Sequence, residues 1–118
     1  MAFYTQADLV TKILDKLGVV PTGNTPQLED VNRIENLLPA IVESVAGREI
    51  LYLPGLNNIE GKYFLPFASI AAWECTEEFG TTGDDLAKLE KDNGNAILQL
   101  RIMTRGRPTY ETLRTQNF

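Results

Sequence analysis

The chain has 118 residues, of which 43% are hydrophobic and 23% charged, and its formal net charge at pH 7 is -5. These values are typical of a single globular domain whose core needs no metal or disulfide, and they exclude a chain that is disordered throughout. The acidic balance also argues against a surface that grips nucleic acid, because such a surface neutralises phosphates with clustered Lys and Arg side chains.

The sequence carries no signal for export or for membrane insertion. No basic segment precedes an apolar run at the N-terminus, and no apolar stretch approaches the roughly 18 residues that a spanning helix needs. Cys75 is the one cysteine, so it has no partner for an internal disulfide and suits a reducing compartment. We therefore expect synthesis in the cytoplasm and no membrane association.

Two helices are predicted in the first half of the chain. The first covers about residues 5–17, with Thr5 as its cap and Gly18 as its end, since glycine takes the left-handed conformation there at no steric cost. The second covers about residues 26–46 as one apolar stripe that keeps its phase through Pro39. An interior proline removes a backbone hydrogen bond at a cost of about 3 kcal/mol. We expect a kinked helix, with two helices as the alternative.

The stretch between the second and third helices contains two short β-prone runs, at 51–53 and 62–64, around a centre rich in turn residues. They predict a small hairpin or an ordered loop. A third helix is then predicted from Pro66 to Gly80. It has apolar side chains over most of its circumference, as expected of a central helix.

A fourth helix of about twenty residues is predicted from Asp84, where a carboxylate favours a helix N-terminus, to a stop at Gly106 and Pro108. The predicted fold is therefore mostly α. It consists of a four-helix, bundle-like domain over residues 1–105, with the loop or hairpin between helices two and three, and an extended C-terminal tail over residues 106–118.

Side chains that catalyse reactions are scarce. The chain has no His, which removes the commonest general base and metal ligand, and the sequence offers neither Ser44 nor Ser69 a base. Cys75 lies among apolar and acidic residues, which raise a thiol pKa, so we interpret it as structural. No glycine-rich phosphate-binding motif is present. We expect no enzymatic activity, no cofactor and no metal.

Three glutamates, Glu74, Glu77 and Glu78, form the densest group of carboxylates, and the predicted third helix places the first and last of them on one face. A solvated helix face is the favoured interpretation. The alternatives are an acidic surface within an assembly, a divalent-ion site, and the acid–base pair of a hydrolase. No other residue at metal-ligand spacing supports an ion site.

The charge is divided unevenly along the chain. Residues 1–100 carry seven basic and fifteen acidic side chains, a balance of -8, whereas residues 101–118 carry four Arg and one Glu, a balance of +3. The tail combines guanidinium groups with aromatic and aliphatic ones, the types that dominate hot spots of protein interfaces. It is either a frayed terminus or a segment that folds on a partner.

The order of these elements resembles that of a known family. The chain is similar to the head-to-tail adaptor proteins of tailed bacteriophages in its opening TQADLVTKILDKLGV, its segment EDVNRIENLLPAIVESV, its helix ending in AAWECTEEFG, and its long last helix followed by a proline-containing tail. The resemblance covers nearly the whole chain. It is greatest to the head-completion, or packaged-DNA-stabilising, group of short-tailed phages.

The resemblance implies a structural protein of the virion, made in the cytoplasm of the bacterial host. Members of this family form a ring of twelve subunits beneath the portal, extend the DNA channel, through which double-stranded DNA passes without specific binding, and offer a lower face to tail or nozzle proteins. Their C-terminal segments bind the portal. On this chain, portal binding then falls on Arg107, Pro108, Tyr110, Leu113, Arg114 and Phe118, and an acidic channel or interface surface on Glu74, Glu77 and Glu78.

A second hypothesis does not depend on the resemblance to phage adaptor proteins. A small helical binding or regulatory module would use the same C-terminal tail to capture another protein partner. Rings of twelve on a portal favour the adaptor, whereas a one-to-one complex favours the binding module.

Overall fold

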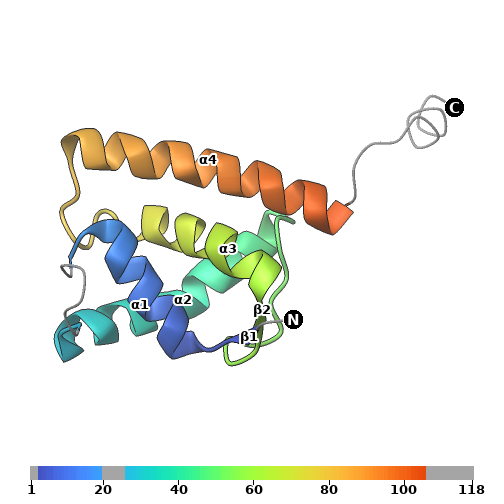
Figure 1. Ribbon diagram of the computed structural model, residues 1–118, viewed down its shortest axis with the longest axis horizontal. Coiled ribbons are helices and arrows are strands. Elements are labelled where there is room, and N and C mark those ends of the chain that lie inside the picture. Colours follow the sequence, from blue (N-terminus) through green and yellow to red (C-terminus); the bar gives the residue numbers. More distant parts are fainter. Residues whose placement is uncertain (1–2, 20–25, 106–118) are drawn as a thin grey trace, which may run out of the picture.

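The computed structural model describes residues 3–19 and 26–105, and this part of the chain is mostly helical (Figure 1). Its elements, in chain order, are β1 (Phe3–Tyr4), α1 (Gln6–Leu17), α2 (Leu28–Gly47), β2 (Ile59–Glu60), α3 (Gly61–Glu74) and α4 (Gly83–Arg105). The predicted mostly α domain with four helices is confirmed. The predicted tail, 106–118, lies outside the described residues.

The predicted first helix, α1, forms with the predicted caps. Oγ1 of Thr5 accepts a hydrogen bond from the backbone N–H of Asp8 at 3.3 Å, and the Asp8 carboxylate accepts one from the backbone N–H of Thr5 at 3.0 Å. Gly18 ends the helix with a φ of 73°, a conformation that costs glycine little. The apolar face of the helix is buried, through Leu9, Val10, Ile13, Leu14 and Leu17.

The second helix, α2, is continuous, so the alternative of two helices is wrong. Pro39 lies inside it on the exposed side. The carbonyl that the proline leaves without an intrahelical partner is therefore on the solvent side, where water can satisfy it. The predicted apolar stripe is buried at Ile34, Leu38, Ile41 and Val45.

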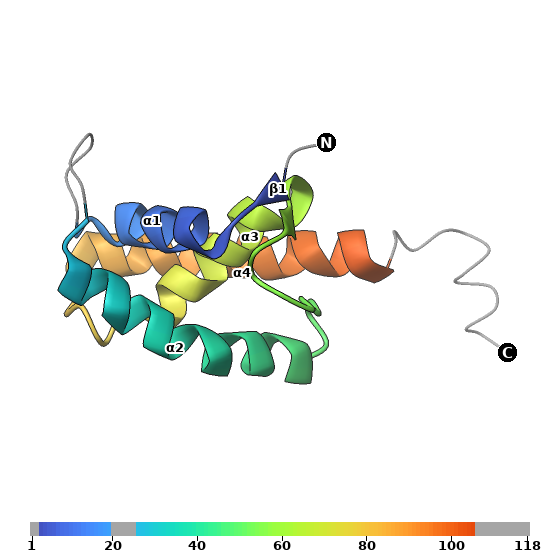
Figure 2. The same ribbon diagram turned by 90° about the horizontal axis from the view of Figure 1, so that it is seen from below.

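The loop between α2 and α3 contributes one strand, but this strand pairs with the N-terminus. β2 runs antiparallel to β1, with Phe3 opposite Glu60 and Tyr4 opposite Ile59. The two strands are labelled side by side in Figure 1, and Figure 2 shows β1 next to the start of α3. Of the two β-prone runs, 51–53 is not a strand and 62–64 belongs to α3, so they do not form a hairpin with each other, and the alternative of a loop between α2 and α3 holds. The small sheet thus fastens the start of the chain to the start of α3.

Burial explains why the run at 62–64 is helical despite its β-prone residues. A buried stripe at helical spacing begins within it and is made of Phe64, Phe67, Ala68, Ala71 and Ala72. A strand would turn alternate side chains of this run away from the core. The ring of Phe64 also stacks on that of Tyr4, with centroids 4.1 Å apart and planes at 16°. Tertiary packing therefore overrides the local preference.

The third helix begins and ends earlier than the predicted range of 66–80. It covers Gly61–Glu74, and the proline expected at its start lies inside it. The glycine expected at its end, Gly80, instead closes a separate turn. Its φ is 64°, and the next N–H, that of Thr81, donates to the carbonyl oxygen of Thr76 at 3.1 Å. The stop signal is real, but it belongs to the connection between α3 and α4.

The core lies around α3, which is the central helix, as predicted. α1 and α4 pack on α3, and α2 packs chiefly on α1. α4 lies along one edge of the molecule (Figure 1). Near its end, the hydroxyl of Thr104 lies 2.8 Å from the carbonyl oxygen of Leu100 and 3.4 Å from that of Ile50, which attaches α4 to the chain after α2. These contacts hold the end of α4, and so the position of the last described residue, Arg105.

Candidate functional site

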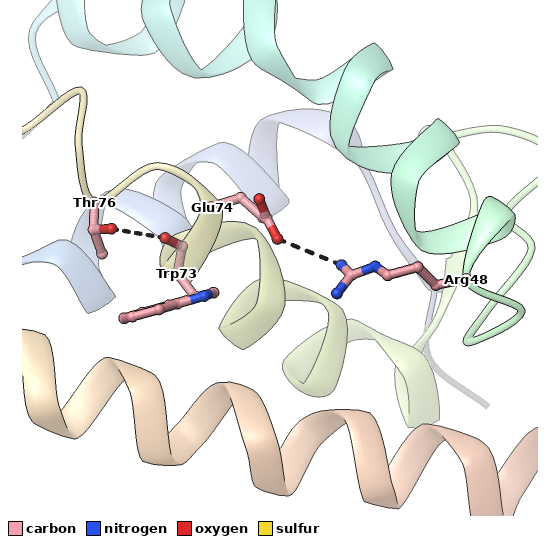
Figure 3. Close-up of polar contacts among 4 residues, drawn as sticks. All are labelled: Arg48, Trp73, Glu74 and Thr76. Carbon is pink, nitrogen blue, oxygen red and sulfur yellow. Dashed lines mark hydrogen bonds and ion pairs between the residues drawn. The ribbon is translucent and has the colours of Figure 1, made fainter.

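The three glutamates of the predicted acidic group, Glu74, Glu77 and Glu78, do not share a helix face. Glu74 is the last residue of α3, whereas Glu77 and Glu78 lie in the turn that follows, so the predicted i, i+4 pair is wrong. The hydroxyl of Thr76 donates to the carbonyl oxygen of Trp73 at 2.9 Å, which satisfies a carbonyl at the end of the helix (Figure 3). Because α3 ends at Glu74, it does not bring the three carboxylates onto one face.

Glu74 is held instead by a basic residue far along the chain. Nη2 of Arg48, directly after α2, lies 3.4 Å from Oε1 of Glu74 (Figure 3). The two side chains keep 41% and 37% of their surface exposed, so water screens the pair. Glu77 and Glu78 are exposed, and neither forms an ion pair within the described ranges. These two are the carboxylates of the group that remain available to a partner.

Cys75, next to Glu74, is buried completely. Burial first, and then the carboxylates of Glu74 and Glu78, raise the pKa of its thiol to about 12. The thiolate is the reactive form of cysteine, and at neutral pH it is almost absent here. These observations support the structural interpretation of this cysteine.

The described residues contain no built site for a metal ion. No group of three or more His, Cys, Asp or Glu side chains in residues 3–19 and 26–105 lies close enough to hold one. Over the same residues, no helix combines the length and the apolar character that crossing a membrane requires.

The predicted portal-binding residues lie outside the described residues; they are Arg107, Pro108, Tyr110, Leu113, Arg114 and Phe118. The structure does give the point from which this segment departs. α4 ends at Arg105, at the opposite end of the helix from its connection to α3 (Figure 1). Next to this end is a hollow of about 260 Å³, lined by Ala46, Glu49, Ile50, Leu51, Tyr52 and Thr104.

Two further exposed surfaces are not among the predicted site residues. The first is on α4, opposite its buried stripe of Leu89, Ala96 and Leu100. It consists of Leu98, which is 62% exposed, Ile102, which is 38% exposed, and the exposed Arg101. We call these three residues the α4 ridge. A signal was present in the sequence, because Leu98 and Ile102 are apolar and fall out of phase with that stripe.

The second surface is on α2, opposite the stripe that the helix buries. Its residues are all exposed and are Glu35, Asn36, Pro39, Ala40 and Glu43. We call this surface the α2 acidic face. Its position follows from the period of the helix, but its lack of neutralising partners depends on contacts that only the folded chain defines.

Comparison with known proteins assigns no family. No protein-family model, no curated protein and no solved structure matches the chain.

Proposed function

We propose that the chain is a structural subunit of a bacteriophage head-to-tail adaptor. Twelve copies form a head-completion ring between the portal and the tail, extend the DNA channel and stabilise the packaged DNA. The C-terminal tail of each copy docks on the portal, and the subunit catalyses no reaction. One observation carries this proposal: the four-helix body has the organisation expected from the resemblance, with α3 at its centre and α4 leading to the tail.

The charge distribution supports the same role. A channel wall along which DNA slides has to avoid clusters of Lys and Arg, because these groups bind phosphates strongly. Residues 1–100 carry fifteen acidic and only seven basic side chains. Glu77 and Glu78 are the first candidates for a channel or subunit surface, because they are exposed and unpaired within the described ranges, whereas Glu74 is engaged by Arg48.

The test is assembly with the portal protein encoded in the same genome. Native mass spectrometry is expected to find twelve copies of the chain on each portal ring. Deletion of residues 107–118 should leave the helical circular-dichroism signal of the body intact and abolish binding to the portal. If the truncated chain bound portal rings with unchanged affinity, the docking role of the tail would be lost.

Substitutions within the tail test whether its apolar side chains, rather than its polar ones, bind the portal. Alanine at the three apolar anchors together is expected to weaken portal binding more than about tenfold, because truncated hot-spot residues cost about 2 kcal/mol or more. These anchors are Tyr110, Leu113 and Phe118. The matched control carries alanine at three polar positions interleaved with them, which are Thr109, Thr112 and Thr115. An equal loss in the control would contradict specific docking.

The same measurement tests the alternative of a small helical binding or regulatory module. In that case the chain forms a one-to-one complex with a protein other than a portal, and no ring of twelve appears. The tail would still be required for binding, so the stoichiometry decides between the two functions.

A further inference from the structure

The α4 ridge combines exposed apolar surface with a positive charge that has no partner. Leu98 and Ile102 are one helical turn apart and are 62% and 38% exposed. Arg101 is exposed and forms no ion pair with any described residue. After Asp92 the helix holds no further acidic residue, so no carboxylate along this half of α4 neutralises the guanidinium group.

The α2 acidic face carries the complementary charge around an uncharged middle. Glu35, Pro39 and Glu43 follow one another at intervals of one helical turn, so the two carboxylates flank the proline. Ala40 lies beside Pro39, and its small side chain permits another helix to approach closely. The face therefore offers a place for apolar side chains between two negative charges.

The basic residues closest to this face in sequence are used elsewhere. Arg33 pairs with Glu29 at 3.6 Å, and its guanidinium carbon lies 5.9 Å from the ring centroid of Phe79. Arg48 pairs with Glu74 at 3.4 Å. Within the described ranges the two carboxylates of the α2 acidic face consequently have no ion pair.

Each of the two surfaces disfavours a second copy of itself. A contact between two α4 ridges would bring Arg101 against Arg101, and a contact between two α2 acidic faces would bring carboxylates together, which is unfavourable. The surfaces also lie on different sides of the molecule, since α3 separates α4 from α2 (Figure 1). A contact between the ridge of one copy and the acidic face of the next is heterologous, and such contacts close into rings when the rotation permits.

We propose that a second copy of this chain covers the α2 acidic face with its α4 ridge. The apolar side chains of the ridge lie on Pro39 and Ala40, and Arg101 pairs with Glu43. This inference rests on the proposed function, because it names the two surfaces through which neighbouring subunits of the ring meet.

Engineered cysteines test the contact, because the native Cys75 is fully buried and does not compete for a maleimide. Full-length chains with Leu98→Cys and with Ala40→Cys are mixed and treated with a short bismaleimide. We expect dimers from the mixture and none from either variant alone. A chain that carries both substitutions is expected to give a ladder of multimers, because each copy then presents both surfaces.

The matched control moves the second cysteine to an exposed position on α1, Thr11→Cys. Its mixture with Leu98→Cys is expected to give no more dimer than the wild-type chain gives. Dimers of Leu98→Cys alone would indicate a symmetric contact and would overturn the proposal. Equal crosslinking to the α1 position, or no crosslink between Leu98→Cys and Ala40→Cys, would overturn it as well.

Charge reversal tests the ion pair between copies. Arg101→Glu and Glu43→Arg are each expected to lower the crosslink yield of the double-cysteine chain by about threefold to tenfold, and the two together to restore most of it. Lys88→Glu is the control, since it makes the same charge change at an exposed position of α4 outside the ridge. It leaves the yield unchanged. A double reversal that fails to recover would overturn the pairing.

Portal complexes separate this inference from the function on which it rests. If twelve copies bind the portal but the two engineered positions do not crosslink there, the ring uses other surfaces; this result contradicts the proposed contact and leaves the adaptor function supported. If the ladder of multimers forms but the portal is not bound, the contact between copies is supported and the adaptor function is contradicted.

Discussion

Nη2 of Arg48 lies 3.4 Å from Oε1 of Glu74, and this contact joins the end of α2 to the end of α3 across 26 residues of sequence. The residues between them include β2 and the loop that precedes it. The pair therefore links the end of one helix to the end of another. Because each side chain keeps more than a third of its surface exposed, the pair is a screened surface contact rather than a buried one.

Arg48→Ala and Glu74→Gln are each expected to lower the free energy of unfolding by about 0.2–1 kcal/mol, and their double-mutant cycle to show coupling of that size. The coupling should shrink in concentrated salt, which screens exposed charges. Urea denaturation measures both effects. Glu77→Gln is the matched control, because this neighbouring carboxylate has no ion pair in the described ranges. Coupling of Arg48 to Glu77 instead would contradict the observed contact.

Cys75 is expected to make the fold less stable at high pH. Burial raises the pKa of its thiol from 9.0 to about 12, so between these values the unfolded chain releases a proton that the native state keeps. The stabilising contribution is thus complete below the unfolded pKa and is lost as the pH rises from 9.0 toward 12. Near pH 10 the loss is about 1 kcal/mol.

The measurement is urea unfolding of the wild-type chain and of Cys75→Ala, at neutral pH and near pH 10. The variant lacks the thiol, so its free energy of unfolding should decline less between the two conditions. Parallel declines would show that the native thiol ionises near its ordinary pKa.

The sequence predicts best those parts of the fold that depend on contacts between residues within one helical turn of each other. Thr5 and Gly18 mark the ends of α1 because each bonds to backbone groups a few residues away. The pairing of β1 with β2 has no such signal, since it joins residues 3–4 to residues 59–60 and each strand is too short to show an alternating pattern. At Phe64, side-chain type favours a strand, but burial against the core makes the residue helical.

The acidic group shows how a misplaced helix end changes a predicted site. Gly80 is a genuine stop signal, but it closes the turn after α3, so Glu78 is not on the helix that carries Glu74. The partner of Glu74 lies 26 residues away, and no local pattern indicates it. The exposure of Leu98, in contrast, follows from its phase on a helix whose period was predicted correctly.

Asn93 places an unpaired amide oxygen on the side of α4 that packs on α3. It is in helical register with the buried residues Leu89, Ala96 and Leu100, and its Oδ1 is buried with no hydrogen-bond partner among the described residues. A buried polar atom that makes no hydrogen bond costs about 1–3 kcal/mol relative to its solvated state. An apolar side chain of similar size would not carry this cost.

Asn93→Leu is therefore expected to raise the free energy of unfolding by about 1–2 kcal/mol, measured by urea denaturation with an unchanged m value. Asn95→Leu is the matched control, because it makes the same change on the exposed side of α4 and should alter stability by less than about 0.5 kcal/mol. A loss of stability in Asn93→Leu would show that the native oxygen has a partner, such as a bound water. Since the α4 ridge lies on the opposite side of the helix from Asn93, Asn93→Leu should not change the crosslink yield between copies, which separates the stability of the body from the contact between subunits.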